Sequence, residues 1–158
     1  METETELDAI DRRILQALQA RGRMTYDELA AGVGLSPSAT LRRVKRLEES
    51  QVITGYVALV APERVGLGLT AYISVRLSKH SESRSPLDAF AAAVQAWPEV
   101  VECSALTGEM DYLLRVLVRD MAHYSHFIME GLLKHPAVQD CKTSFMLRRL
   151  KGTTAVPV

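Results

Sequence analysis

The residues most informative about chemistry are the cations of the stretch 42–46, which reads Arg-Arg-Val-Lys-Arg. On a helix, with about 100° per residue, these cations continue a face that carries small residues at its N-terminal end. Small residues let a helix end approach base edges in the major groove of DNA, and arginines bind guanine or phosphate. An amphipathic helix with a solvated basic face is the alternative that this stretch alone leaves open. The predicted DNA-contacting residues are Ser36, Ser38, Ala39, Arg42, Arg43, Lys45 and Arg46, with Arg43 at the margin of the face.

Other groups of reactive side chains give weaker indications. His123 and His126 have helical spacing, but a metal site needs more ligands at suitable geometry, and none is obvious. Cys103 and Cys141 fall on predicted strands, where a small apolar role is more common than a redox role. The acids within 108–112 have no accompanying nucleophile, oxyanion loop or metal cluster. We therefore predict no catalytic residue, no metal and no cofactor.

A set of three helices must position the cationic stretch. Apolar residues at positions 7, 10, 14, 15 and 18 form one face of a first helix, which Gly22 ends. Thr25 and Glu28 have the spacing of a capping box, in which each side chain satisfies a backbone donor of the first turn. After a glycine turn, Ser36 caps a third helix with Pro37 at its first position. Positions 41, 44 and 47 are its predicted buried stripe. This combination is typical of a helix-turn-helix.

The hydrophobic period changes after the third helix. Residues 52–60 are β-branched and apolar and are predicted to form a strand, and residues 61–68 are predicted to form a linker. The remaining segments are predicted as a strand at 69–77, a polar loop at 78–86, a helix at 87–97, strands at 100–106 and 112–118, a helix at 121–135 and a strand at 138–149.

An internal repeat runs through this second half. Residues 98–103, Pro-Glu-Val-Val-Glu-Cys, match residues 136–141, Pro-Ala-Val-Gln-Asp-Cys, and each segment follows a predicted helix and leads into a strand. Two βαβ copies build a ferredoxin-like βαββαβ sandwich, with both helices on one face of the sheet. The other face needs a cover, and we expect a second copy of the chain to provide it. The predicted fold class is therefore α+β.

Length and composition narrow the class of protein. The 158 residues suit one domain or two small ones, and 47% apolar and 24% charged residues are ordinary for a globular chain. The formal net charge is zero, so any attraction to DNA must come from local placement of cations. Residues 1–11 do not form a secretory signal, and no apolar run approaches the roughly 20 residues that span a bilayer. Two cysteines cannot build a disulfide framework. We expect a cytoplasmic protein without a membrane partner.

Three stretches, taken in order, resemble the Lrp/AsnC family, the leucine-responsive or feast/famine regulators of bacteria and archaea. The first is Leu-Asp-Ala-Ile-Asp-Arg-Arg-Ile-Leu at 7–15. The second runs from Leu-Ser-Pro-Ser at 35–38 through the cationic helix to Val-Ile-Thr-Gly-Tyr at 52–56. The third is Thr-Gly-Glu-Met-Asp-Tyr at 107–112. Together they cover the chain from residue 7 to about residue 151.

The resemblance implies an N-terminal winged-type helix-turn-helix, a strand-bearing hinge and a C-terminal βαββαβ domain called RAM. In the family, the RAM domain pairs subunits and commonly binds an amino acid, and dimers often associate further. On this basis we predict a DNA-binding domain at 1–51, a strand and hinge linker at 52–68, and a RAM effector-binding and oligomerisation domain at 69–158.

The resemblance also places an effector at the loop between the two central strands. Backbone N–H groups around a glycine turn can bind a carboxylate, and Asp111 can accept from an ammonium group. The residues alone favour a plain turn, with glycine for the backbone and acids for solubility. The predicted effector-binding residues are Thr107, Gly108, Glu109, Met110, Asp111 and Tyr112.

Two positions depart from the family pattern. Gln51 stands where relatives usually have glycine, which would end the helix in a left-handed conformation without strain. We expect a small local cost there and no change of fold. Met110 stands where an aromatic residue is common, which leaves the identity of the ligand open.

The resulting prediction is a sequence-specific DNA-binding transcriptional regulator, modulated by an amino acid or a related metabolite and acting as a homo-oligomer on double-stranded DNA. An architectural DNA-binding protein without an effector is the alternative. A metabolic enzyme subunit that uses the βαββαβ domain as an allosteric module is a third hypothesis, against which the helix-turn-helix argues. The operator, the sense of regulation and the size of the assembly stay open.

Overall fold

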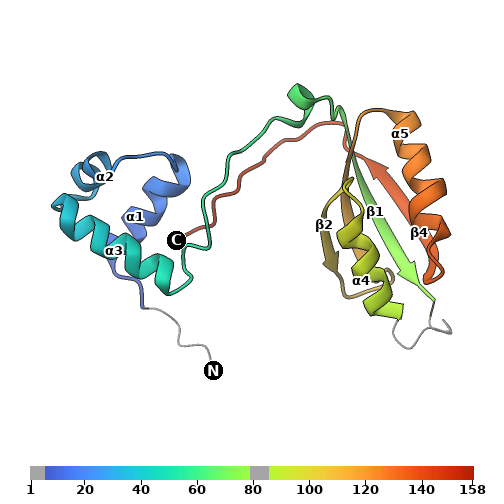
Figure 1. Cartoon of the computed structure of the whole chain (residues 1–158), viewed down its shortest axis with the longest axis horizontal. Coiled ribbons are helices and arrows are strands. Elements are labelled where there is room, and N and C mark those ends of the chain that lie inside the picture. The colour runs from blue at the N-terminus through green and yellow to red at the C-terminus, as the bar shows by residue number, and fades with distance from the viewer. Residues whose placement is uncertain (1–5, 79–85) are drawn as a thin grey trace. The chain divides into compact units, whose positions relative to one another are not determined.

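Contacts divide the chain into two units (Figure 1). The computed structural model describes residues 6–78 and 86–158, so the predicted polar loop at 78–86 falls outside the described residues except at its two ends. One unit comprises Met1–Leu59 together with Lys151–Val158, and the other comprises Val60–Leu150. The tail was predicted as part of the C-terminal domain. Its residues instead contact the N-terminal unit, because the side-chain amides of Gln16 and Gln19 donate to its backbone carbonyls.

The N-terminal unit contains helices α1 (Ala9–Ala20), α2 (Tyr26–Val33) and α3 (Pro37–Glu49). The capping predictions are confirmed. Thr25 Oγ1 accepts from the Glu28 N–H at 3.2 Å, and the Glu28 carboxylate accepts from the Thr25 N–H at 2.8 Å. Ser36 caps α3 with Pro37 inside the first turn. These caps fix where the second and third helices begin.

The three helices enclose one apolar cluster, made of Ile14, Leu15, Leu29, Val33, Val44 and Leu47. Val44 and Leu47 are buried as predicted, whereas Leu41 is only partly buried. Thr40 is fully buried on α3, and its hydroxyl donates to the Ser36 carbonyl at 3.0 Å. A threonine can therefore be buried on α3, because the backbone at the start of the helix accepts the hydrogen bond of its hydroxyl.

The predicted strand at 52–60 is wrong. These residues lie outside any helix or strand, and Val57, Leu59 and Val60 are 82%, 74% and 63% exposed. β-branched residues favour a strand only where a neighbouring strand accepts their backbone hydrogen bonds and covers one face. No strand among residues 6–78 and 86–158 pairs with this segment. The linker prediction holds for the residues that follow, with a short 3₁₀ turn at Pro62–Val65.

The C-terminal unit has the predicted βαββαβ order (Figure 1). Its elements are β1 (Leu69–Leu77), α4 (Pro86–Ala96), β2 (Val100–Ala105), β3 (Tyr112–Val118), α5 (Met121–His126) and β4 (Val138–Phe145). The sheet order is β2-β3-β1-β4 and every pairing is antiparallel, so the repeated βαβ units interleave as in a ferredoxin-like fold. The repeat Pro-Glu-Val-Val-Glu-Cys leads into one edge strand, and its counterpart leads into the other.

Two predicted ends differ from the structure. The helix predicted over 121–135 is α-helical only to His126 and continues as a π-helical turn at Phe127–Gly131 and a 3₁₀ turn at Leu132–Lys134. The strand predicted to reach residue 149 ends at Phe145. Its partner β1 begins at Leu69, and the last bond joins the Met146 N–H to the Thr70 carbonyl. Beyond that point no partner strand continues.

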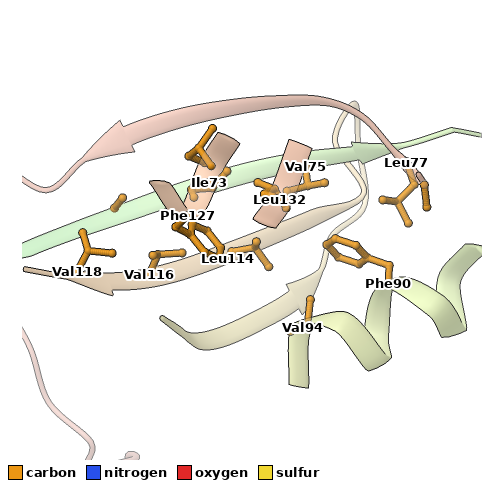
Figure 2. Packing of buried hydrophobic residues seen from close by; sticks show 13 residues of the cluster. Ile73, Val75, Leu77, Phe90, Val94, Leu114, Val116, Val118, Phe127 and Leu132 are labelled. Atoms are coloured by element: carbon orange, nitrogen blue, oxygen red, sulfur yellow. The ribbon is translucent and has the colours of Figure 1, made fainter. Parts of the chain in front are cut away.

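The core lies between the sheet and the two helices (Figure 2). Alternate residues of β1 and β3 point into it, among them Ile73, Val75, Leu114 and Val116, which have no exposed surface. Phe90 of α4 is also fully buried against this face. Residues at the alternate positions of both strands point to the opposite face. On that face Tyr72, Ser74 and Arg115 are half-buried, and its cover by a second copy stays a prediction.

Gln51 has φ 56°, the one positive φ of a non-glycine residue in the described chain. A left-handed backbone costs an L-residue about 1–2 kcal/mol, which glycine would avoid. The greater entropy of glycine in the unfolded chain would offset about half of that gain. Gln51→Gly is expected to raise the free energy of unfolding of the N-terminal unit by about 0.5–1 kcal/mol, measured by urea denaturation. Glu49→Gly, inside α3, is the control and should lower it. A lower stability of Gln51→Gly would contradict the assignment of strain.

Candidate DNA-binding and effector sites

The predicted cationic face of α3 divides into two pairs. Arg43 Nη1 donates to Asp8 Oδ2 at 2.7 Å and to Asp11 Oδ1 at 2.8 Å. Arg46 forms an ion pair with Asp11 Oδ2. The Asp11 side chain has no exposed surface, whereas those of Arg43 and Arg46 are 25% and 51% exposed. Asp8, Asp11, Arg43 and Arg46 form what we call the Asp11 cluster, which joins α1 to α3. Its two arginines were predicted to contact DNA, and in the structure both form ion pairs with aspartates of the N-terminal unit.

The acids of the Asp11 cluster also begin α1. Asp8 Oδ1 accepts from the Asp11 N–H at 2.8 Å, and Asp11 Oδ2 accepts from the Asp8 N–H at 3.2 Å. This is a capping box built from two aspartates. The backbone hydrogen bond from Asp11, and next the bond from Arg43, lower the pKa of Asp8 to about 2. The two carboxylates raise the pKa of Arg43. Asp8 and Arg43 therefore stay charged near neutral pH.

The other predicted DNA-contacting residues face solvent. Arg42, Lys45, Ser36 and Ser38 are exposed, and Ala39 is half-buried. In the described ranges, no acidic group forms an ion pair with Arg42 or Lys45. The Ser36 hydroxyl lies 3.2 Å from that of Ser38 and accepts from the Ala39 N–H, so it serves mainly as the helix cap. Arg42 and Lys45 are thus the exposed cations of the predicted set that form no ion pair among the described residues.

The predicted effector loop joins β2 to β3. Gly108 has φ 126°, a conformation that residues with a Cβ rarely adopt, so glycine is required at this turn. The Asp111 N–H donates to the Val75 carbonyl at 2.9 Å, and Asp111 Oδ2 accepts from the Leu77 N–H at 2.7 Å. Asp111 was predicted as a free acceptor for an ammonium group. One of its oxygens instead ties the end of β1 to the loop.

Two cations near this loop were missed in the sequence. Arg76 donates to Glu109 Oε1 at 2.8 Å and to the Glu109 carbonyl at 3.2 Å, and Lys142 Nζ lies 4.0 Å from the same carboxylate. Both cations stand at alternate positions of apolar strands, which could have placed them on the sheet face away from the helices. The site therefore holds fixed positive charge beside the loop. The Arg76 guanidinium also approaches the Met110 sulfur at 3.8 Å.

The remaining predicted effector residues have different surroundings. Thr107 is exposed, whereas Tyr112 is half-buried and its ring lies 5.1 Å from that of Phe90. Tyr112 therefore packs against the core at the base of the loop. The base of the loop is therefore held by contacts of Tyr112 and Asp111, and its outer turn is exposed.

The histidine pair lacks the surroundings of a metal site. His123 Nε2 lies 3.1 Å from Glu99 Oε1, and its Nδ1 accepts from the Arg119 N–H at 3.3 Å. Both ring nitrogens are thus engaged within the protein. Within the described ranges there is also no group of three or more potential metal ligands, and no helix long and apolar enough to cross a bilayer.

Family models match both parts of the chain that carry these candidate sites. A family model for a winged helix-turn-helix DNA-binding domain matches residues 7–54, and one for the Lrp/AsnC ligand-binding domain matches residues 70–156. The chain belongs to the Lrp/AsnC family. The predicted resemblance is therefore confirmed, and the two matches fall on the helix-turn-helix and on the βαββαβ unit.

Relatives of this Lrp/AsnC regulator match along nearly the whole chain. The Bkd operon transcriptional regulator of Pseudomonas aeruginosa is 40% identical over 153 residues, covering 97% of this chain and 99% of that protein. The leucine-responsive regulatory protein of Rhizobium meliloti is 39% identical over the full length of both. A transcriptional regulator of Neisseria meningitidis, solved as a complex with L-methionine, is 48% identical, with a TM-score of 0.92 over 96% of this chain and 97% of that one. The chain is a DNA-binding transcriptional regulator with this family's ligand-binding domain.

Proposed function

We propose that this regulator responds to an amino acid that binds at the loop 107–112 and alters how paired copies present α3 to DNA. The supporting observation is the loop itself: Gly108 turns the backbone outward beside the cation Arg76, while Asp111 fixes the base of the loop. Backbone N–H groups and cations bind a carboxylate, and the remaining oxygen of Asp111 can accept from an ammonium group. The Neisseria relative bound to L-methionine supports the ligand class.

Oligomerisation, location and the absence of catalysis belong to the same proposal. Tyr72, Ser74 and Arg115 on one face of the sheet are half-buried within a single chain, and a second copy would cover them. Two copies would then carry two α3 helices to half-sites separated by about 34 Å or a multiple of it. The relatives are transcription regulators, which supports a non-enzymatic role in the cytoplasm.

The first test is a thermal-shift screen of the twenty amino acids, with L-methionine as the first candidate. A ligand that binds only the folded state raises its stability, by about 2.7 kcal/mol at a concentration 100 times its Kd. A shift with at least one amino acid is expected, followed by a change in mass or DNA affinity with that amino acid. No shift with any of them would contradict the effector proposal and favour an architectural protein.

Arg42 is proposed to read DNA bases. It is exposed near the middle of α3 and forms no ion pair with the acidic residues of the described chain. Arg42→Ala is expected to cost about 1–3 kcal/mol of discrimination between the bound site and unrelated DNA. Competition gel shifts on the promoter beside the protein's own gene would measure it. Arg64→Ala, which removes the same charge from the 3₁₀ turn, is the control. Unchanged discrimination in Arg42→Ala would exclude this role.

Asp111 is proposed to bind the ammonium group of the effector. Because one of its oxygens also holds the Leu77 N–H, alanine would disturb β1, whereas Asp111→Asn keeps an acceptor and removes only the charge. A hydrogen bond to a charged group contributes about 1.5–3 kcal/mol, so affinity for L-methionine is expected to fall about tenfold or more. Calorimetry would measure it, with the exposed Asp27→Asn of α2 as the control. DNA binding without ligand should be unchanged. Equal affinity in Asp111→Asn would contradict the assignment.

A further inference from the structure

We propose that Asp11 is a positioning residue for DNA reading, which pairs Arg43 and Arg46 with α1 and so leaves Arg42 and Lys45 as the DNA-facing cations. The inference rests on the proposed function in one respect only, that Arg42 and Lys45 contact DNA. It assigns a role to an acidic residue of α1 that itself does not face the nucleic acid.

The first argument is burial. Asp11 has no exposed surface, and its two oxygens accept from the Asp8 N–H, from Arg43 and from Arg46. A carboxylate without water needs such donors, because an unpaired buried charge is strongly destabilising. No buried side-chain nitrogen or oxygen in the described residues lacks a hydrogen-bond partner. The two arginines are therefore structural partners of Asp11.

The second argument is direction along the recognition helix. Arg43 and Arg46 are three residues apart, so they lie on one side of α3. Arg42 and Lys45 have the same spacing but are displaced by one residue, or about 100° around the helix. A rotation of α3 by one residue would bring Arg42 and Lys45 to the place of Arg43 and Arg46, and it would turn Arg43 and Arg46 toward the buried side of the helix. The buried residues Val44 and Leu47 favour one rotation, and hydrogen bonds from two arginines to a single carboxylate restrict it further, because such bonds require defined angles.

The third argument is what released arginines would do. The Arg46 side chain is 51% exposed, so its guanidinium can turn toward solvent once its partner charge is removed. Free arginines bind phosphate, and contacts to phosphate fix position without reading sequence. By keeping these cations from phosphate, Asp11 keeps nonspecific binding low relative to binding at the operator.

The test is Asp11→Asn, which keeps the shape and one acceptor and removes the charge. Binding to the promoter fragment and to unrelated DNA is measured against salt concentration, at a temperature where circular dichroism shows a folded protein. The released arginines are expected to steepen the slope of log affinity against log salt by about 0.9 for each new phosphate contact, which is one or two contacts. The ratio of specific to nonspecific affinity is expected to fall at least tenfold. A folded variant with the wild-type slope and ratio would overturn the proposal.

A triple variant and two single variants keep the result interpretable. Asp11→Asn with Arg43→Gln and Arg46→Gln has no released cation and should return to the wild-type slope; a slope that stays steep would overturn the proposal. If Asp11→Asn does not fold, the test uses Arg46→Gln and Lys45→Gln instead. Arg46→Gln should keep the wild-type slope, whereas the slope of Lys45→Gln should be smaller by about 0.9. A loss of that size in Arg46→Gln would place Arg46 on phosphate and overturn the proposal. Failure of the proposed function is seen separately, as unchanged discrimination in Arg42→Ala.

Discussion

Replacement of Asp11 with alanine is expected to lower the free energy of unfolding of the N-terminal unit by about 3 kcal/mol. Removing one partner of a buried charge pair costs about 3–5 kcal/mol, because the remaining charge loses its compensation. The lower end applies because Arg46 is 51% exposed and can regain water, whereas Arg43 keeps Asp8 as a partner. The substitution also leaves the Asp8 N–H without its acceptor.

Urea denaturation followed by far-ultraviolet circular dichroism would measure this loss, since the three helices of the N-terminal unit dominate that signal. Asp27→Ala is the matched control, because Asp27 is an exposed acid in the first turn of α2. A surface change of this kind is expected to stay within about 0.5 kcal/mol of the wild type. A similar small effect in Asp11→Ala would show that the Asp11 cluster contributes little to stability.

The second large effect is expected at Phe90. Its side chain is fully buried, with ring centroids 6.1 Å from Trp97, 5.1 Å from Tyr112 and 5.6 Å from His135. Phe90→Ala leaves a cavity between α4 and the sheet and is expected to lower the free energy of unfolding of the C-terminal unit by about 3–5 kcal/mol. Trp97 is the one tryptophan of the chain, so its fluorescence reports on this unit.

Phe90→Leu is the control for the aromatic site. It keeps most of the apolar volume and is expected to cost about 1–1.5 kcal/mol. Because Tyr112 packs on the Phe90 ring at the base of the loop, folded Phe90→Ala should also bind any amino acid found by the thermal-shift screen more weakly than Phe90→Leu does. Equal stabilities of the two variants would mean that the core closes around the lost ring.

Local chemistry made much of this fold predictable. The caps at Thr25 and Ser36 depend on residues three positions away, and the strand β3 was predicted at its observed bounds because an apolar run after a glycine turn is a local signal. The repeated segments at 98–103 and 136–141 predicted equivalent strands, and the sheet order places these strands at its two edges. In each case the information lies within one element or its immediate neighbours.

The errors come from partners distant in the chain. The helical wheel of α3 showed four cations outside the apolar stripe, but Asp11, 32 residues before Arg43, determines which of them are engaged. For the same reason, the sequence did not show that Asp111 accepts from the Leu77 N–H, which lies 34 positions away. The segment 52–60 has the composition of a strand, but a strand also needs a neighbour. Only folding of the chain brings these partners together.

The tail that packs on α1 has a consequence for synthesis of the protein. Residues 151–158 belong to the same unit as residues up to Leu59, so the C-terminal domain is a topological insertion within the N-terminal one. A ribosome that adds about 5–20 residues per second takes roughly 5–20 s to make the intervening segment 60–150. During that interval Gln16 and Gln19 of α1 lack the tail to which they donate. The N-terminal unit therefore cannot be completed until the intervening ligand-binding segment has been translated.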